Sequence, residues 1–594
     1  MKNFLRTVFG SCLGVLLAIL VIGLIATLIG GSVMSKSSSK PSLSSNSVLR
    51  LDFKKLIPEK TDNTAQGTDF FKEEKNLGLH EILTTIEHAK DDKKIKGILL
   101  DLGFNSFGNA KAEAIRNALL DFKESEKFVY AYANRYGYGQ GAYYLATTAD
   151  RIWLHPLGAV DFRGFGVEMP FFKDLLDKVG VDIRPFYAGK FKSATEPFRR
   201  NNMSEENRKQ IREYVSEMWE DFLSDIADSR DLSKEELRSL AASVEGRLPA
   251  KAVAAGLVDG LMYEDQVFDE LRSALDLDKD DKINFTSLEN YNAAKGKDLN
   301  LSAPSKIAIL YAEGQIRMGT ETYGTITDQH YVDMLRKIRK DDKVDALVLR
   351  VNSGGGDAIA SDMIWREIEL LKEKGVKVVA SFADVAASGG YYIACGADKI
   401  LAEPNTITGS IGVFGMAPNV QELFNEKLGI YMDTVKTLPY ATGIISPFYP
   451  VSSEQARLIQ EGVDHTYEVF LSRVADGRDM TRDQVHEIAQ GRVWTGRMAL
   501  ENGLVDELGD IKTAVAQAAD LADVDDYRIT EYPRIKDPMT LLLEELTGQK
   551  TSTNWYDAAL QQRFPEAAEM LETLEYLLST DQPQARIPFY FNGL

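Results

Sequence analysis

Apolar and polar positions along the chain form blocks that predict strands followed by helices. Residues 91–103 and 341–353 each begin with a polar helix end and continue into an unbroken apolar run. Such a run is typical of a strand buried in a parallel sheet. Segments with helical periodicity follow both runs. This alternation predicts an α/β fold made of helix and sheet layers.

The same order of elements occurs twice, at a spacing of about 249 residues. The matching segments are residues 91–103 with 341–353, residues 127–156 with 377–404, and residues 246–260 with 491–509. We therefore predict a tandem duplication. Its expected parts are a first repeat at residues 51–300, a second repeat at residues 301–530 and a C-terminal helical tail at residues 531–594, in which we see no chemistry.

A long apolar segment precedes the repeats. Residues 8–29 contain no charged side chain and are long enough to cross a bilayer core of about 30 Å as a helix. A cleavable signal peptide is the alternative, but its apolar region would be shorter and would end in a cleavage site that is absent here. We expect residues 1–35 to be an uncleaved membrane anchor, and residues 36–50, which are rich in serine, to be a flexible linker.

Composition excludes several classes of protein. The chain has 594 residues, 44% of them hydrophobic and 27% charged, which is close to the globular average. The formal net charge of −20 opposes binding to a phosphate backbone, so we expect no nucleic-acid partner. With only two cysteines, neither a disulfide framework nor a cysteine metal cluster is expected.

The two repeats differ where a nucleophile is possible. The turn after one strand of the second repeat contains Ser388, followed by Gly389, and the aligned position in the first repeat is Gln140. A serine there lies beside free backbone N–H groups at a helix start. The alternative is that Ser388 only caps the helix that follows.

A second difference is a glycine-rich loop. The second repeat has Ser353 followed by three consecutive glycines, including Gly355 and Gly356, directly after its buried strand. The N–H groups of such a loop are able to stabilise an oxyanion. The loop has neither a Walker nor a dinucleotide-binding pattern.

A serine nucleophile needs a base, and none of the six histidines has a recognisable triad context. The first repeat contains Lys190 and Lys192 among aromatic residues, whereas the corresponding stretch of the second repeat has no lysine. Both lysines point to the same face of an extended chain, so spacing does not choose between them. One repeat thus keeps the serine and the other keeps the lysine, which predicts one composite site per chain.

These motifs resemble the long, duplicated form of signal peptide peptidase, a family of membrane-anchored Ser/Lys-dyad proteases with a Clp-protease-like or crotonase-like fold. The resemblance covers most of residues 51–530 and is most specific in YAGKFKSATEPF, LRVNSGGGDAIAS, ADVAASGGYYIACGAD, NTITGSIGVFG and GRVWTGRMALENGLVDELGD. Gly354 replaces a proline that relatives often have.

The resemblance implies a role for six residues. It assigns the nucleophile to Ser388, the general base to Lys192 rather than Lys190, and a lysine-binding hydroxyl to Ser410. The implied oxyanion donors are N–H groups at Gly355, Gly356 and Gly389. Burial beside Phe191 and Phe198 would keep the Lys192 amine neutral.

The resemblance also implies a function. It predicts a serine endopeptidase that degrades cleaved signal peptides and other apolar peptides, without cofactor or metal. The expected location is the bacterial inner membrane, with a single span and the catalytic body on the periplasmic side, and the expected assembly is a homotetramer. Two other classes remain open: a crotonase-like acyl-CoA enzyme and a non-catalytic membrane scaffold.

Overall fold

The computed structural model describes residues 43–53, 56–61, 76–103, 107–134, 136–295, 302–320, 324–534 and 584–586. The expected membrane anchor and nearly all of the expected C-terminal tail lie outside these ranges. The expected flexible linker, residues 36–50, ends too late, because residues 47–50 belong to a mostly buried strand of the first sheet. Among the described helices, none has the length and apolar character needed to span a membrane.

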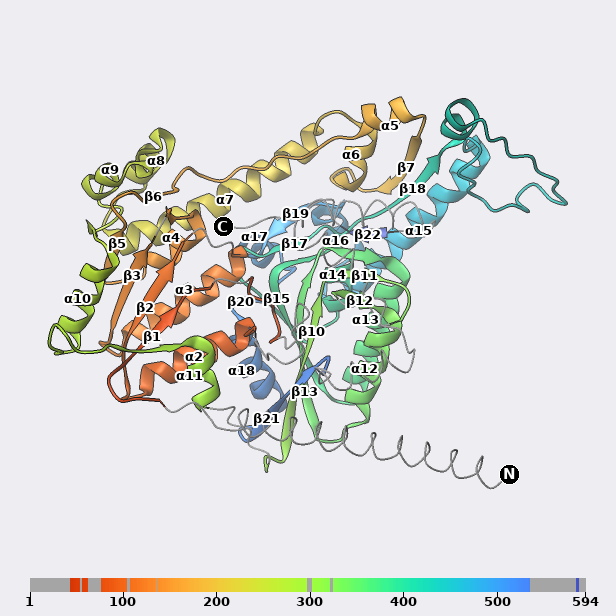
Figure 1. Cartoon of the computed structure of the whole chain (residues 1–594). Helices are drawn as coiled ribbons and strands as arrows, with labels where there is room; N and C mark the ends of the chain where they lie inside the picture. Colours follow the sequence, from red (N-terminus) through yellow and green to blue (C-terminus); the bar gives the residue numbers. More distant parts are fainter. Residues whose placement is uncertain are drawn as a thin grey trace, which may run out of the picture.

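The first repeat contains a parallel six-stranded sheet with the order β8-β5-β3-β2-β1-β9 (Figure 1). Its strands are β1 (Ser47–Leu51), β2 (Ile95–Leu102), β3 (Phe128–Ala133), β5 (Arg151–Leu154), β8 (Gly260–Leu261) and β9 (Asn284–Ser287). A small separate pair is formed by β4 (Gly137–Tyr138) and β6 (Ala159–Val160).

The second repeat contains a sheet whose strands follow the same order. The parallel path β20-β16-β15-β13-β10-β21 matches the six strands of the first sheet, and β17 and β19 extend β15 on one side. The strands are β10 (Ser305–Glu313), β13 (Val344–Ser353), β15 (Lys377–Ala387), β16 (Lys399–Ala402), β17 (Ile407–Gly409), β19 (Val493–Thr495), β20 (Glu507–Leu508) and β21 (Tyr527–Tyr532). The identical order confirms an α/β fold with a duplicated unit.

Helices connect the strands of both repeats. The first repeat contains α2 (Leu79–Asp91), α3 (Asn109–Lys123), α4 (Gln140–Ala146), α5 (Lys173–Val179), α6 (Glu196–Arg199), α7 (Glu205–Arg230), α8 (Lys234–Ser243), α9 (Pro249–Ala254), α10 (Glu264–Ala274) and α11 (Leu288–Lys295). The second contains α12 (Asp328–Lys340), α13 (Ala358–Glu373), α14 (Gly389–Ala394), α15 (Ser453–Gly477), α16 (Arg482–Ile488), α17 (Gly496–Glu501) and α18 (Ile511–Ala522). Short helical turns lie at Ser193–Thr195, Glu245–Arg247 and Leu423–Leu428.

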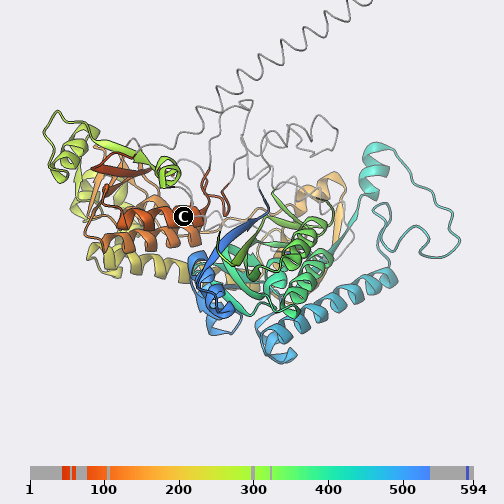
Figure 2. The same ribbon diagram turned by 90° about the horizontal axis from the view of Figure 1, so that it is seen from below.

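The two repeats lie side by side and share a core (Figure 2). One cluster of buried apolar side chains includes Ile98 of β2 and Val348 of β13 together with Ala514 of α18. The long helix α7 also joins the repeats, because its acidic side chains meet the segment around β19: Glu217 accepts from the Thr495 hydroxyl at 2.5 Å and Asp221 pairs with Arg497 at 3.0 Å. The repeats are therefore parts of one packed body.

A third sheet crosses the boundary between the repeats. Its order is β12-β11-β14-β22-β18-β7, with β7 (Asp182–Ala188) from the first repeat and the rest from later in the chain. The other strands are β11 (Gln315–Arg317), β12 (Thr325–Thr327), β14 (Gly355–Asp357), β18 (Val413–Asn419) and β22 (Gln584–Arg586). Strand β7 pairs antiparallel with β18, with Ala188 opposite Val413. This pairing brings the segment after β7 next to the loop before β18.

Candidate active site

Lys192 is held against the backbone of the second repeat. Gly189 lies just after β7 with φ +103°, and a Cβ at this position would overlap the backbone of Gln490. The N–H of Phe191 donates to the Gln490 carbonyl at 2.9 Å. On the other side, Gly491 contacts Lys192 so closely that an added Cβ would lie 2.6 Å from the Lys192 Cβ. Glycine is needed at both points for this close approach.

Ser388 lies between β15 and α14 in a strained backbone conformation. Its φ of 56° and ψ of −116° fall in a region that L-residues rarely occupy, and such a conformation costs about 1–3 kcal/mol. Its N–H donates to the Gly409 carbonyl at 2.8 Å, which holds the strained turn. The Ser388 side chain makes no capping hydrogen bond to α14. The capping alternative therefore does not describe this serine.

The two side chains meet although 196 positions separate them. The Lys192 Nζ lies 2.7 Å from the Ser388 Oγ. Lys192 is 3% exposed and Ser388 is fully buried. An amine and a hydroxyl at this distance, shielded from water, have the geometry of a nucleophile and its base.

Ser410 lies on the other side of the same amine. Its carbonyl oxygen is 3.0 Å and its Oγ 3.1 Å from the Lys192 Nζ. Ser410 is buried, and its φ of 50° continues a left-handed turn that begins at Gly409. Three oxygen atoms from two serines thus surround the amine.

The glycine loop forms strand β14 beside this pair. Gly390 of α14 approaches the loop so closely that a Cβ would lie 2.5 Å from the Ser353 carbonyl oxygen. The N–H of Gly355 donates to the Ser353 Oγ at 3.1 Å. A Cβ on Gly356 would overlap the Ile316 carbonyl of β11. The start of α14, which contains Gly389, therefore packs against the glycine loop, and within that loop the Gly355 N–H is bound to the Ser353 hydroxyl.

Lys190 and Gln140, which the sequence comparison set beside Lys192 and Ser388, do not contribute to the pair. Lys190 is exposed, and its Nζ lies 5.4 Å from the centre of the Phe191 ring. Gln140, the counterpart of Ser388, binds backbone instead: its Oε1 accepts from the N–H groups of Arg163 and Gly164, both at 3.1 Å. At this position the first repeat thus has a side chain that binds loop backbone.

No group of metal ligands is found within the described ranges. A set of buried charges nearby was not anticipated from the sequence, however. It includes Arg350, which lies within the apolar run of β13 and is 1% exposed. The sequence signal for this set of charges was an arginine in the middle of an apolar strand, because a buried charge needs a partner.

Known proteins are similar to this chain over most of its length. The family model of peptidase family S49 matches residues 121–278 and 370–525, one segment in each repeat. Protease 4 of Salmonella typhi is 37% identical over 478 residues, which cover 79% of this chain and 76% of the relative. Protease 4 of Haemophilus influenzae is 34% identical, covering 83% and 82%.

Similar proteins also occur outside bacteria. The chloroplastic serine protease SPPA of Arabidopsis thaliana is 32% identical, covering 82% of this chain and 72% of the relative. Among solved structures, a ClpP1 mutant from Listeria monocytogenes aligns with 35% of this chain at 14% identity and a TM-score of 0.24. The family match decides for a peptidase over an acyl-CoA enzyme or a scaffold. The chain belongs to peptidase family S49 and is a serine peptidase.

Proposed function

We propose that the protein is a membrane-anchored endopeptidase that degrades cleaved signal peptides and other apolar peptides, with Ser388 as nucleophile and Lys192 as general base. The observation that carries this proposal is the 2.7 Å contact between the Lys192 Nζ and the Ser388 Oγ. Each residue comes from a different repeat, so one chain has one complete pair.

The hydrogen-bonding capacity of a neutral amine fits its surroundings. A neutral lysine has two N–H donors and one lone pair. The two donors match the carbonyl oxygen and the Oγ of Ser410. In the neutral form the lone pair is left for the Ser388 hydroxyl, whose Oγ lies 2.7 Å from the amine. Burial favours the neutral form of an amine over the ammonium form. In this state Lys192 is able to accept the Ser388 proton.

The reaction then proceeds through an acyl-enzyme. As Lys192 takes the proton, the Ser388 Oγ attacks the peptide carbonyl, and N–H groups of the glycine loop and of Gly389 stabilise the oxyanion. Collapse of the intermediate breaks the peptide bond, and Lys192 gives its proton to the leaving amine. A water molecule then attacks the ester while Lys192 takes one of its protons. Collapse of this second intermediate releases the acid product, and Lys192 returns the proton to the Ser388 Oγ.

Strand β22 supports an extended peptide as the substrate. Its residues pair antiparallel with the glycine loop, with Arg586 opposite Gly355 and Ala585 opposite Gly356. Its other edge meets β18, where Gln584 lies opposite Phe414. The edge between β14 and β18 thus accepts an added strand, which is a common way of binding peptides through their main chain.

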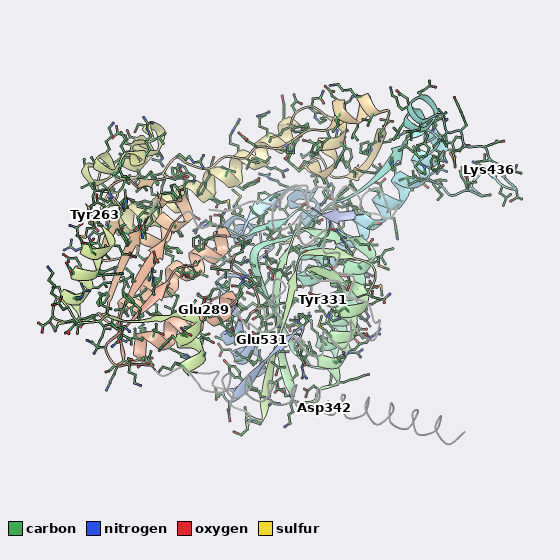
Figure 3. All side chains as sticks on the ribbon, viewed as in Figure 1. Tyr263, Glu289, Tyr331, Asp342, Lys436 and Glu531 are labelled. Atoms are coloured by element: carbon green, nitrogen blue, oxygen red, sulfur yellow. The ribbon has the colours of Figure 1, made fainter. Side chains whose placement is uncertain are left out.

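The membrane and assembly parts of the proposal rest on two apolar segments. Residues 8–29 are the proposed anchor, which would hold the catalytic body on the periplasmic side of a bacterial inner membrane. A second segment, residues 428–444, projects from the body near Lys436 (Figure 3) and exposes Leu428, Tyr431, Val435 and Leu438. Exposed apolar side chains in such number are typical of an interface. They support contact with another copy of the chain, and the proposed assembly is a homotetramer.

The test is hydrolysis of a quenched apolar signal peptide by the full-length protein in detergent. Ser388→Ala and Lys192→Ala are expected to lose activity by at least about 1,000-fold, as removal of members of a catalytic unit does. Lys190→Ala, the matched control two residues away, should keep wild-type activity. Activity in Ser388→Ala, or loss in Lys190→Ala equal to that in Lys192→Ala, would contradict the assignment.

A further inference from the structure

Strand β15 leaves its regular pairing just before the nucleophile. Along most of its length it pairs in parallel with β13, and Val351 lies opposite Phe382. The next pair is Ser353 with Ala386, so β15 advances further than β13 over this stretch. An irregularity of this kind is frequent next to active sites, because it redirects the residues that follow. Here those residues lead directly to Ser388.

In the irregular segment, side chains bind backbone groups of β15 in place of the neighbouring strand. Arg350 Nη1 donates to the Phe382 carbonyl at 3.0 Å. The Val385 N–H donates to the Asn352 Oδ1 at 3.2 Å. These contacts replace ladder hydrogen bonds, whose loss would leave buried polar groups unsatisfied. Arg350 and Asn352 therefore help to hold the backbone that leads into Ser388, together with Thr406, whose hydroxyl donates to the Ala383 carbonyl at 2.7 Å, and with β17, which pairs with residues 385–387.

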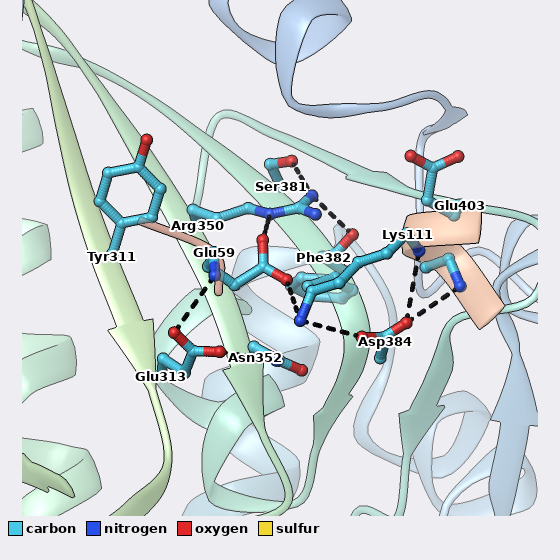
Figure 4. Close-up of polar contacts among 12 residues, drawn as sticks. Glu59, Lys111, Tyr311, Glu313, Arg350, Asn352, Ser381, Phe382, Asp384 and Glu403 are labelled. Atoms are coloured by element: carbon cyan, nitrogen blue, oxygen red, sulfur yellow. Dashed lines mark hydrogen bonds and ion pairs between the residues drawn. The ribbon is translucent and has the colours of Figure 1, made fainter. Parts of the chain in front are cut away.

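Arg350 is itself held by charges from the first repeat (Figure 4). Its Nε pairs with Glu59 Oε2 at 2.8 Å, and Glu59 Oε1 lies 3.2 Å from Lys111 Nζ. The same Lys111 Nζ lies 3.4 Å from Asp384 Oδ2, within the irregular segment. Asp384 also accepts the N–H of Ala110, in the first turn of α3, at 3.0 Å.

Asn352 is linked to the same cluster through Glu313 of β10. Its Nδ2 donates to Glu313 Oε1 at 3.2 Å, and Glu313 Oε2 accepts the N–H of Glu59 at 3.4 Å. Asn352 precedes Ser353, whose Oγ accepts the Gly355 N–H. The cluster thus reaches the glycine loop as well as the nucleophile turn.

Burial makes each of these contacts depend on the others. Glu59 and Arg350 are each 1% exposed and Lys111 is 8% exposed. Burial opposes ionisation of Glu59, but Arg350 and Lys111 outweigh it and lower the pKa of this carboxyl. Removing one partner from such a cluster leaves a buried charge uncompensated, so the remaining groups must move.

We propose that Lys111 and Glu59 of the first repeat are positioning residues for the reaction, which hold the nucleophile turn and the glycine loop of the second repeat in register. The first repeat then contributes to the site twice: through Lys192 at the nucleophile and through this cluster beneath the two loops. The inference rests on the proposed roles of Ser388 and the glycine loop.

The experiment compares Lys111→Met with Arg116→Met. Both residues lie on α3 and are buried, but Arg116 binds groups of the first repeat: the carbonyls of Tyr144 and Asp225 and the hydroxyl of Thr147. The measurements are kcat and KM for the quenched peptide, the rate of labelling by a fluorophosphonate, and the thermal unfolding midpoint. All rates are taken well below the lower midpoint.

Lys111→Met is expected to lower kcat about 100-fold, because a misplaced reacting group costs about this much. KM should stay within about twofold, and fluorophosphonate labelling should slow by a similar factor to kcat. Arg116→Met should lower the unfolding midpoint and keep kcat. A Lys111→Met variant with wild-type kcat, or equal losses of kcat in both variants, would overturn the inference.

A second variant covers the case in which Lys111→Met fails to fold. Asp384→Asn keeps an oxygen to accept the Ala110 N–H but removes the charge that faces Lys111. We expect about a tenfold loss of kcat, and wild-type kcat would overturn the inference. Ser388→Ala separates the two proposals. If it is inactive while Lys111→Met and Asp384→Asn keep full kcat, only the positioning role fails; if it is active, the proposed nucleophile fails.

Discussion

Ser410 contacts the amine of Lys192 twice, through its carbonyl oxygen at 3.0 Å and through its hydroxyl at 3.1 Å. The preceding residue, Gly409, accepts the N–H of Ser388 at 2.8 Å through its own carbonyl. One turn therefore fixes both members of the pair. Its conformation requires positive φ at Gly409 and Ser410, which are 75° and 50°.

Ser410→Ala tests the contribution of the hydroxyl. The carbonyl contact remains in this variant, so Lys192 loses one of its two hydrogen bonds to Ser410. We expect kcat to fall by about 10- to 100-fold, since one hydrogen bond to a charged or catalytic group contributes about 1.5–3 kcal/mol, and KM to stay unchanged. Ser472→Ala, which removes an exposed hydroxyl on α15, is the control. Unchanged kcat in Ser410→Ala would show that the carbonyl alone orients the amine.

Gly356→Ala tests how closely the glycine loop must pack. The added Cβ would overlap the Ile316 carbonyl of β11, so β14 must shift. We expect a loss of kcat of at least about 100-fold, the cost of losing one oxyanion donor, and a lower unfolding midpoint. In the control Gly462→Ala, on helix α15, the new methyl group meets nothing within 4 Å beyond the adjoining backbone of its own helix. That variant should gain up to about 1 kcal/mol of stability and keep its activity.

Removal of residues 580–594 tests whether β22 competes with substrate. This strand pairs with β14 at Gly355 and Gly356, where the main chain of a peptide is proposed to bind. A tethered segment has an effective concentration of about millimolar and therefore raises the apparent KM of a competitor. We expect truncation to lower KM for the quenched peptide several-fold. The control ends after residue 587, retains β22 and should behave as wild type. A higher KM in the longer truncation would contradict competition.

Glu113 is expected to make stability depend on pH. Burial, with repulsion from Asp225 and Asp221, raises the pKa of this carboxyl to about 8 from a usual value of 4.5. The folded chain therefore keeps a proton that the unfolded chain releases between these values. The stability contribution is present below about pH 4.5 and is lost as pH rises towards 8, by up to about 1.4 kcal/mol per pH unit.

Glu113→Gln should remove this loss of folding stability at higher pH. The amide oxygen still accepts from Asn405, which donates to Glu113 Oε2 at 3.0 Å. The measurement is the free energy of urea unfolding between pH 5 and 8 for both proteins. The variant should have the shallower decline and the higher stability at pH 8. Equal slopes would mean that Glu113 is ionised in the folded chain.

The sequence alone was sufficient to predict the two repeated α/β units, but not the third sheet, which crosses the boundary between them. The two apolar runs at residues 91–103 and 341–353 became β2 and β13, and the second sheet repeats the strand order of the first. Both signals are local, because buried parallel strands require continuous apolar runs. The absence of the lysine from one repeat and of the serine from the other also predicts a composite site.

Contacts across the repeat boundary were decided by tertiary structure. The sequence pattern left Lys190 and Lys192 equivalent, and the pairing of β7 with β18 turns Lys192 towards Ser388 while Lys190 stays exposed. The strained conformation of Ser388 depends on a carbonyl at Gly409, and Arg350 depends on Glu59, which lies 291 positions away. Local propensity carries no information about such distant partners. The sequence by itself therefore determined the two folded units and their separate chemical groups, and the packing of one unit against the other decided which groups meet.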